Sequence, residues 1–407
     1  MGDYFPPPSK SFAIRNLIVA SLSEGESVIK DINLSDDIKS TIKVIKKWRK
    51  IKFLNANEIL VGEWNGKIPE GKFYVGGSAT VARILLALFS FIDGKRVIDG
   101  NFNLKRRDFS STIKAANLIG LKFTELGKRG HLPILVEGKK FKCNKITVCD
   151  ENSSQFASGV LIALSFLKRK CQIKVKKSIS FPYVKMTEEV LRKFGTKITS
   201  KEKSFFLEKS FLKGNIVETE KDYSQSAFFG AGAVVTGGKI KIYGLNKRSK
   251  QGDRIFFDTL KKCGVAVSWK GDFLEISGFP KKGIDVNLRK TPDLLPPLSV
   301  VALKCPSESL FRGITRLSIK ESSRAYEIAQ TIKKIGGDAK IYKDSLRIEP
   351  SNRYMGKTLD PKNDHRLAMA YAFYGILAEG TKIKKIECVK KSYPTFWEDF
   401  ESMIKKN

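Results

Sequence analysis

Residues 153–167 read SSQFASGVLIALSFL, a short polar cluster followed by an almost wholly apolar run. A helix that is apolar on every side is buried, so we predict a core helix that begins at the polar cluster. The same pattern begins again at five other places, near residues 9, 76, 224, 292 and 363. Successive starts lie roughly 70 residues apart, which is longer than the common solenoid periods. Six copies in 407 residues predict two domains of three repeats each.

Short β-rich runs separate these helices, and they are bounded by glycine, proline or asparagine as strands and turns are. Second helices are expected within residues 187–198, 256–267 and 328–341. Each of these segments is amphipathic and reaches a glycine before the next strand, which is a normal helix end. The repeat unit therefore combines two helices with several strands, and the fold class is α/β.

The composition is that of a folded protein with a strong excess of positive charge. Lys and Arg number 75 against 42 Asp and Glu, so the formal net charge is +33. Such a charge favours anionic partners, which include phosphorylated metabolites, nucleic acid and anionic lipid. The six cysteines form no C-x-x-C motif and are interpreted as reduced thiols. Two histidines argue against a histidine-based zinc site, and the apolar run 84–92 is too short for a membrane span. We expect a cytoplasmic protein.

The helix starts are the informative part of each repeat. A helix N-terminus offers unpaired N–H groups and a partial positive charge, so it attracts anions. Ser, Asn and Asp at such positions are also ordinary N-caps, and for any one repeat the cap is the favoured interpretation. For the whole set, with Lys10 and several arginines alongside, we favour a site for a ligand with several negative charges.

Motifs at these starts and between them follow the order of the enolpyruvyl transferases, from about Pro8 to Pro394. They are SKSxxxR (9–15), GGSATVAR (76–83), LKRRD (104–108), SSQF (153–156), SFPY (180–183), DYSQSAFF (222–229), QGD (251–253), TPDLLPP (291–297), RLSIKESSR (316–324), NDHR (363–366) and CVKKSYPTF (388–396). The chain resembles in particular the 5-enolpyruvylshikimate-3-phosphate synthase branch of this family. Each motif alone is weak, and their order over the whole length carries the resemblance.

The resemblance implies two domains, each of three βαβαββ units, with the ligand cleft between the domains. It places residues 9–221 in one domain, and residues 1–8 with 222–407 in the other. It implies transfer of the enolpyruvyl group of phosphoenolpyruvate to the 5-hydroxyl of shikimate 3-phosphate, with release of phosphate, in aromatic amino-acid biosynthesis. The reaction is addition followed by elimination, and the resemblance implies neither a metal nor an organic cofactor.

The resemblance also implies roles for individual residues. The residues that face shikimate 3-phosphate would be Lys10, Ser11, Arg15, Ser153, Ser154, Gln155, Ser180, Tyr183, Asn287, Arg316 and Lys320. Those that hold phosphoenolpyruvate would be Lys10, Ala79, Thr80, Arg107, Gln155, Arg324, Arg366 and Lys391. The groups that move protons would be Lys10, Glu321, which protonates the methylene carbon, and His365, which supports it. Each of these roles has a structural alternative. The alternatives are surface ion pairs for the arginines, an exposed helix pair with Lys320 for Glu321, and a helix cap for His365.

One departure concerns the base that removes the hydroxyl proton. The family has an aspartate five residues before its Pro-Asp, and this position is Asn287, whose amide takes no proton at neutral pH. Asp285 faces the same side of an extended strand, roughly 6–7 Å away. We rank three explanations in this order. Asp285 replaces the family's aspartate, or Lys10 removes the proton while Asn287 orients the substrate, or the protein is catalytically impaired.

Three rival functions remain open. Asn287 is consistent with a catalytically impaired family member. The charge of +33 and basic runs such as 43–52 are consistent with a nucleic-acid-binding protein, although no nucleic-acid-binding motif is present. The sister enzyme that acts on UDP-N-acetylglucosamine has a Lys-Asn start and a reactive cysteine, neither of which is recognised here. We expect a monomer whose partners are the two small substrates, without membrane or nucleic acid.

Overall fold

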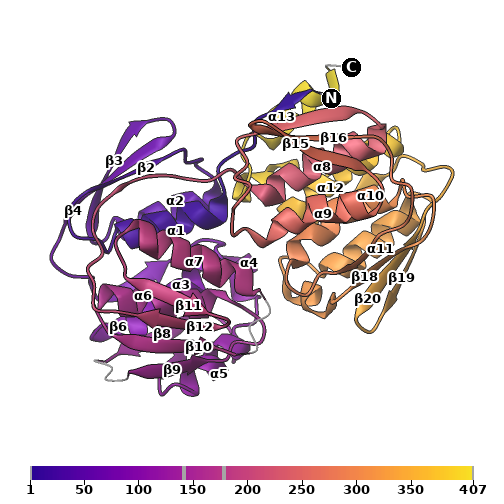
Figure 1. Cartoon of the computed structure of the whole chain (residues 1–407). Coiled ribbons are helices and arrows are strands. Elements are labelled where there is room, and N and C mark those ends of the chain that lie inside the picture. Colours follow the sequence, from indigo (N-terminus) through magenta and orange to yellow (C-terminus); the bar gives the residue numbers. More distant parts are fainter. Residues whose placement is uncertain (1, 140–143, 177–179, 406–407) are drawn as a thin grey trace. The chain divides into compact units, whose positions relative to one another are not determined.

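The computed structural model of the chain describes residues 2–139, 144–176 and 180–405, and they form two compact units. Unit 1 consists of Met1–Pro7 with Glu220–Asn407, and unit 2 consists of Pro8–Thr219. Each unit has its own hydrophobic core. Figure 1 shows unit 2 in indigo to magenta and most of unit 1 in orange to yellow.

Unit 2 contains three repeats. The first has α1 (Lys10–Ala20), β2 (Ser27–Lys30), α2 (Asp36–Ile45), β3 (Arg49–Asn55), β4 (Glu58–Trp64) and, from the end of the unit, β13 (Ile216–Glu218). The second has β5 (Gly71–Tyr74), α3 (Ala79–Ser90), β6 (Gly94–Asp99), α4 (Phe102–Lys105), α5 (Ser110–Asn117), β7 (Phe123–Glu125) and β8 (Ile134–Gly138). The third has β9 (Lys145–Val148), α6 (Gln155–Phe166), β10 (Cys171–Val175), α7 (Phe181–Lys193), β11 (Ile198–Lys201) and β12 (Ser204–Leu207).

Unit 1 contains the other three repeats. The fourth has β1 (Asp3–Tyr4), α8 (Tyr223–Thr236), β14 (Lys239–Tyr243), η1 (Gly252–Arg254), α9 (Ile255–Lys262), β15 (Ala266–Lys270) and β16 (Phe273–Ser277). The fifth has β17 (Asp285–Asn287), η2 (Pro292–Leu294), α10 (Leu295–Ala302), β18 (Ser309–Arg312), η3 (Thr315–Ile319), α11 (Arg324–Lys334), β19 (Asp338–Tyr342) and β20 (Ser345–Glu349). The sixth has β21 (Thr358–Leu359), α12 (His365–Leu377), β22 (Lys382–Ile383), η4 (Ile386–Lys391) and α13 (Phe396–Lys405).

The first five repeats share one sheet topology. In the third repeat, β9 pairs with β10 in parallel, and β10, β12 and β11 follow as antiparallel neighbours. The predicted α/β class with repeated helices and strands is confirmed. The sixth repeat differs, because its sheet has two strands among the described residues and the amphipathic helix α13 follows where the other repeats have a hairpin.

Two sheets are completed by strands from distant parts of the chain. The N-terminal strand β1 pairs in parallel with β14, so the first residues of the chain belong to unit 1 (Figure 1). The Tyr4 hydroxyl lies 2.9 Å from the Tyr393 hydroxyl, which fastens this strand further. The strand β13 closes the first sheet of unit 2 by pairing with β2.

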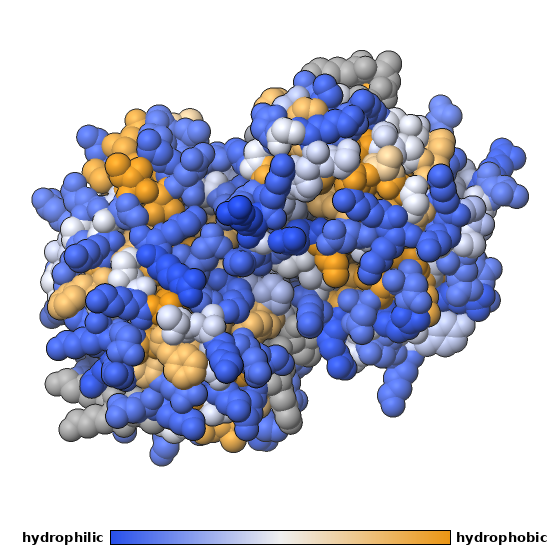
Figure 2. Space-filling view, in the orientation of Figure 1, coloured by the Kyte–Doolittle hydropathy of each residue, from blue (hydrophilic) through white to orange (hydrophobic). Residues whose placement is uncertain are grey.

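The predicted core helices are buried, as the apolar pattern requires. In unit 2 these are α1, α3 and α6, and in unit 1 they are α8, α10 and α12, which contact one another. Among the residues described, no helix is long and apolar enough to cross a membrane. The face shown in Figure 2 is largely hydrophilic on both units, with scattered apolar patches.

The closest packing of α3 against α6 depends on Gly159. A Cβ atom at this position would lie 2.6 Å from the Ala87 Cβ and 2.7 Å from the Ile84 carbonyl oxygen, so the two helices would have to separate. We therefore expect Gly159→Ala to lower the free energy of unfolding by about 1–3 kcal/mol, as overpacking does. Urea denaturation measures this change.

A matched glycine provides the control. Gly375 lies in α12, and a Cβ there would meet Thr381 at 3.6 Å, an ordinary van der Waals distance. Gly375→Ala should raise the free energy of unfolding by up to about 1 kcal/mol through helix propensity. Equal effects of the two substitutions would contradict the proposed role of close helix packing.

Candidate functional site

Most predicted residues of unit 2 lie at the starts of its helices. Lys10 and Ser11 begin α1, Ala79 and Thr80 begin α3, Ser154 and Gln155 begin α6, and Ser180 with Tyr183 begins α7. Of the four preceding cap residues, Ser78 caps its helix by accepting the Val81 N–H. The Ser9 and Ser154 side chains make no capping hydrogen bond to their own helices in the described chain, so their hydroxyls are not explained as caps.

Arg15 joins α1 to α7. Its guanidinium donates to the Ser11 carbonyl oxygen at 2.8 Å, to the Tyr183 carbonyl oxygen at 3.2 Å and to the Thr187 hydroxyl at 2.8 Å. Arg15 is 1% exposed. Burial lowers its pKa to about 10, although the neighbouring Tyr183 acts in the opposite direction. The side chain remains a cation at neutral pH and holds two of the predicted residues in place.

Lys10 pairs with a carboxylate that the sequence analysis missed. Its ammonium lies 2.7 Å from Asp37 Oδ2, and the Asp37 side chain is only 5% exposed. Asp37 lies 27 positions from Lys10 in the sequence, and such a separation gives no local signal for the pair.

Gln155 connects two groups of predicted residues. Its side-chain amide nitrogen donates to the Thr80 hydroxyl at 2.7 Å, and its amide oxygen accepts from Arg83 at 3.3 Å. The Gln155 N–H donates to the Ser153 hydroxyl at 3.1 Å. Arg107, which follows α4, is half-buried, and Arg83 donates to the main-chain oxygen of its neighbour Asp108 at 2.9 Å. Unit 2 thus brings Ser153, Gln155 and Thr80 into one hydrogen-bonded set.

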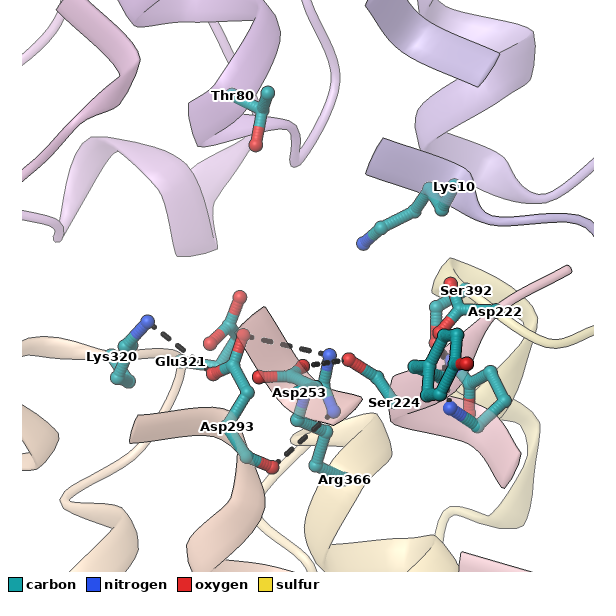
Figure 3. Close-up of polar contacts among 12 residues, drawn as sticks. Lys10, Thr80, Asp222, Ser224, Asp253, Asp293, Lys320, Glu321, Arg366 and Ser392 are labelled. Atoms are coloured by element: carbon teal, nitrogen blue, oxygen red, sulfur yellow. Dashed lines mark hydrogen bonds and ion pairs between the residues drawn. The ribbon is translucent and has the colours of Figure 1, made fainter. Parts of the chain in front are cut away.

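Three of the predicted cations of unit 1 gather around Asp293 in η2, and Figure 3 shows two of them, Lys320 and Arg366, beside it. Asp293 lies 2.8 Å from Arg324, 3.3 Å from Lys320 and 3.5 Å from Arg366. Burial would raise the pKa of Asp293, but Arg366, Lys320 and Arg324 hold that pKa well below its usual value. Asp293 is therefore an anion that three cations from three segments share.

Arg324 carries the densest set of ion pairs in this cluster. Its side chain is 1% exposed and also contacts Asp364 at 2.9 Å and Glu321 at 3.0 Å. Burial acts to lower its pKa, but Asp364, Asp293 and Glu321 together raise it above the ordinary value. Asp364 additionally caps α12 by accepting the Arg366 N–H at 3.0 Å. In the sequence, Asp293 and Asp364 stand out only as parts of helix starts.

The remaining predicted residues of unit 1 take different positions. Lys391 at the end of η4 lies 3.5 Å from Glu321, and Arg316 in η3 is half-buried. His365 is the first residue of α12 and is buried. Burial lowers the pKa of Lys320 to about 8, a shift that Asp293 opposes and Arg316 supports.

The two residues considered for the base lie on β17 and have partners of their own. Asp285 and Asn287 are exposed while Val286 between them is buried, so they face the same side, as predicted. Asp285 is held by both terminal nitrogens of Arg312 from the adjacent strand β18. The Asn287 side-chain oxygen accepts the Arg289 N–H at 3.0 Å. Neither Arg312 nor Arg289 belongs to the cluster of ion pairs around Asp293.

A second buried carboxylate lies near this cluster and was also missed. Asp253 in η1 accepts a hydrogen bond from Ser224 at the start of α8 (Figure 3). Burial raises the pKa of Asp253 to about 6, and Asp293 acts in the same direction while Arg366 opposes it. Both residues stand in motifs recognised in the sequence, QGD and DYSQSAFF, but neither motif indicated the contact.

Known proteins similar to the chain share one description. A profile of the family described as EPSP synthase (3-phosphoshikimate 1-carboxyvinyltransferase) matches residues 2–400. A protein of Korarchaeum cryptofilum named 3-phosphoshikimate 1-carboxyvinyltransferase is 33% identical over 98% of this chain and 95% of its own length. One of the same name from Methanococcus aeolicus is 31% identical, with 98% and 95% covered. A solved structure of EPSP synthase from Acinetobacter baumannii superposes with a TM-score of 0.80 at 23% identity, covering 98% of this chain and 95% of that one.

Proposed function

The chain belongs to the EPSP synthase family, and on that basis we propose that it transfers the enolpyruvyl group of phosphoenolpyruvate to the 5-hydroxyl of shikimate 3-phosphate. A bond forms between the hydroxyl oxygen and C2 of phosphoenolpyruvate while C3 takes a proton. The tetrahedral adduct then loses phosphate and a proton from C3. Both substrates are strongly anionic, so the catalyst must supply fixed cations.

The observation that carries the proposal is the gathering of Lys320, Arg324 and Arg366 around Asp293. Cations held at fixed positions by protein carboxylates are already arranged for an incoming anion, which favours electrostatic catalysis. We propose that Arg324, Arg366 and Lys391 of unit 1, with Arg107 and the Ala79–Thr80 backbone of unit 2, bind phosphoenolpyruvate.

For shikimate 3-phosphate we propose a set dominated by the helix starts of unit 2. The phosphate would be bound by the hydroxyls of Ser153, Ser154 and Ser180, with Arg316 assisting. The ring would be contacted by Ser11, Arg15, Tyr183, Asn287 and Lys320, while Gln155 and Lys10 would contact both substrates.

We propose separate proton roles for the two units. Glu321 of unit 1 would protonate the methylene carbon, with His365 in support. For the hydroxyl proton we favour Lys10 over Asp285, because both Asp285 oxygens are occupied by Arg312. Lys10 would take this proton as the free amine, and Asp37 would hold the side chain in place. Asn287 would then orient the substrate.

The test is release of inorganic phosphate by the purified protein when both substrates are present and when each is omitted. Release that requires both substrates is the expected result. A folded protein that binds shikimate 3-phosphate but releases no phosphate would instead be an impaired family member. Salt-sensitive binding to nucleic acid without substrate binding would favour the nucleic-acid interpretation.

We also propose that the protein acts in the cytoplasm as a monomer. The thiols of Cys149, Cys263, Cys305 and Cys388 are free, which suits a reducing compartment, whereas Cys143 lies outside the described residues. Light scattering of the purified chain tests the monomer.

The lowered pKa of Lys320 predicts an alkaline limit of activity. As the pH rises through about 8, Lys320 loses its charge, and kcat/KM for shikimate 3-phosphate should fall. Lys320→Arg should move this limit to higher pH, because arginine keeps its proton. A pH profile of initial rates for both proteins measures the effect.

The stability of the fold should follow the opposite trend in the same range. An unfolded lysine titrates near 10.5, so between about pH 8 and 10.5 the unfolded chain binds more protons at this position than the folded chain. The contribution of Lys320 to stability therefore rises with pH while activity falls. A parallel loss of stability and activity in this window would contradict the assignment to Lys320.

A further inference from the structure

Five residues of unit 2 form a closed ring of hydrogen bonds through their side chains and main-chain N–H groups. Arg83 Nε donates to the Thr112 hydroxyl at 3.1 Å, and that hydroxyl donates to Asp150 Oδ2 at 2.9 Å. Asp150 Oδ1 accepts the Ser153 N–H at 3.1 Å. The Gln155 N–H donates to the Ser153 hydroxyl at 3.1 Å, and Gln155 Oε1 accepts from Arg83 at 3.3 Å. We call Arg83, Thr112, Asp150, Ser153 and Gln155 the hydrogen-bond ring.

Asp150 is a buried carboxylate that ties two segments together. It is 1% exposed, and besides its ring contacts it accepts the Ser111 hydroxyl at 2.9 Å and the Asn152 N–H at 3.2 Å. Its two oxygens thus connect α5 to the turn that precedes α6. Because a buried carboxylate must have its lone pairs satisfied, this set of donors fixes where the turn lies.

Thr112 gives the ring its direction. Its hydroxyl oxygen accepts from Arg83, so its single proton is available for Asp150, and both contacts exist at once. The Thr112 hydroxyl thereby links the negatively charged Asp150 carboxylate to the Arg83 guanidinium. Arg83 is 6% exposed, and its guanidinium lies 4.3 Å from the Phe109 ring centroid. The position of Arg83 therefore depends on an acid that it does not touch in this set of contacts.

The ring reaches both proposed substrates. Ser153 and Gln155 belong to the proposed shikimate 3-phosphate set. Gln155 Nε2 also donates to the Thr80 hydroxyl at 2.7 Å, and Arg83 donates to the main-chain oxygen of Asp108, next to Arg107. Thr80 and Arg107 belong to the proposed phosphoenolpyruvate set.

We propose that Thr112 and Asp150 are positioning residues through which occupation of Ser153 by shikimate 3-phosphate strengthens the binding of phosphoenolpyruvate; this rests on the proposed function. The Ser153 hydroxyl now donates weakly to Gln155 Oε1 at 3.4 Å. When a substrate phosphate accepts the hydrogen bond from the Ser153 hydroxyl instead, Gln155 Oε1 accepts a hydrogen bond from Arg83 only. Hydrogen bonds in a connected set polarise one another, so Arg83, Gln155 and Thr80 become better ordered for the second substrate.

The test measures coupling between substrates rather than activity alone. Initial rates over a grid of both substrate concentrations give the factor by which shikimate 3-phosphate changes the apparent affinity for phosphoenolpyruvate. In the unmodified chain we expect at least about five-fold, the lower end of usual couplings between sites. In Thr112→Val, which removes the hydroxyl and keeps the shape, and in Asp150→Asn, we expect a factor near one.

Two further variants separate positioning from structure. Thr112→Ser keeps the hydroxyl and should restore the coupling. Ser111 also donates to Asp150 Oδ1 but is not a member of the hydrogen-bond ring. Ser111→Ala should therefore leave the coupling unchanged. The unfolding temperature is measured for each, and if Asp150→Asn fails to fold, Thr112→Val and Thr112→Ser decide the question.

The outcomes distinguish this inference from the proposed function. The inference is overturned if Thr112→Val leaves the coupling unchanged, or if the coupling factor of the unmodified chain is one. The proposed function stands in both cases as long as product is formed. Calorimetric titration with shikimate 3-phosphate alone tests the first substrate directly. Absence of both binding and product in the unmodified chain overturns the two together.

Discussion

Arg324→Met is expected to lower the free energy of unfolding by about 3–5 kcal/mol and to reduce kcat/KM for phosphoenolpyruvate at least 100-fold. Removing one partner of a buried ion pair costs roughly this much, because the other partner keeps its charge without compensation. In this case three carboxylates, Asp293, Asp364 and Glu321, lose a shared cation. The activity falls because the same guanidinium is proposed to bind the substrate. Urea denaturation and initial rates measure the two effects.

The matched control is an exposed arginine that also binds an aspartate. Arg312 pairs with Asp285 through both terminal nitrogens, but their side chains are 48% and 61% exposed. Arg312→Met should change the free energy of unfolding by less than about 1 kcal/mol, as surface pairs do, and should leave kcat/KM within two-fold. Similar losses for both variants would show that burial does not set the cost at Arg324.

Lys10→Met is expected to reduce kcat by about 10²–10⁴, the usual contribution of a positioned acid or base. The ion pair with the buried Asp37 at 2.7 Å holds the Lys10 side chain in place, and the substitution removes both the amine and this contact. Asp285→Asn should leave kcat within about three-fold, because Asp285 is bound to Arg312 and is proposed to take no part. Steady-state kinetics at saturating substrates compare the two variants.

Asn287→Asp supplies the opposite test. It restores the carboxylate that the family resemblance leads one to expect at this position. If Lys10 is the base, Asn287→Asp should change kcat little. An increase of more than about ten-fold would instead mean that a carboxylate at residue 287 is the better base and that this chain works without it.

The helices and their starts could be predicted because their signals are local. The apolar runs specify buried helices, and α7, α9 and α11 end near the positive-φ glycines Gly195, Gly264 and Gly336 that marked them in the sequence. The alternation of Asp285, Val286 and Asn287 also followed from strand geometry alone.

The partners of these residues could not be predicted, because they come from distant segments. Asp37 is 27 residues from Lys10, and Asp364 is 40 residues from Arg324. Asp150 and Thr112 lie in no recognised motif, although they connect two that were recognised. Counting the acids near each cationic motif would have marked Asp293 and Asp364, but not which cations they bind.

The pairing of β1 with β14 has a consequence for synthesis of the protein on the ribosome. Unit 2 is one continuous segment, Pro8–Thr219, whereas unit 1 joins the first residues to Glu220–Asn407. Unit 2 is therefore complete before the partner of β1 has been translated, and the N-terminal strand must wait for the chain to extend beyond Tyr243. For engineering, unit 2 can be expressed as an uninterrupted gene fragment, whereas unit 1 requires a new linker from Pro7 to Glu220.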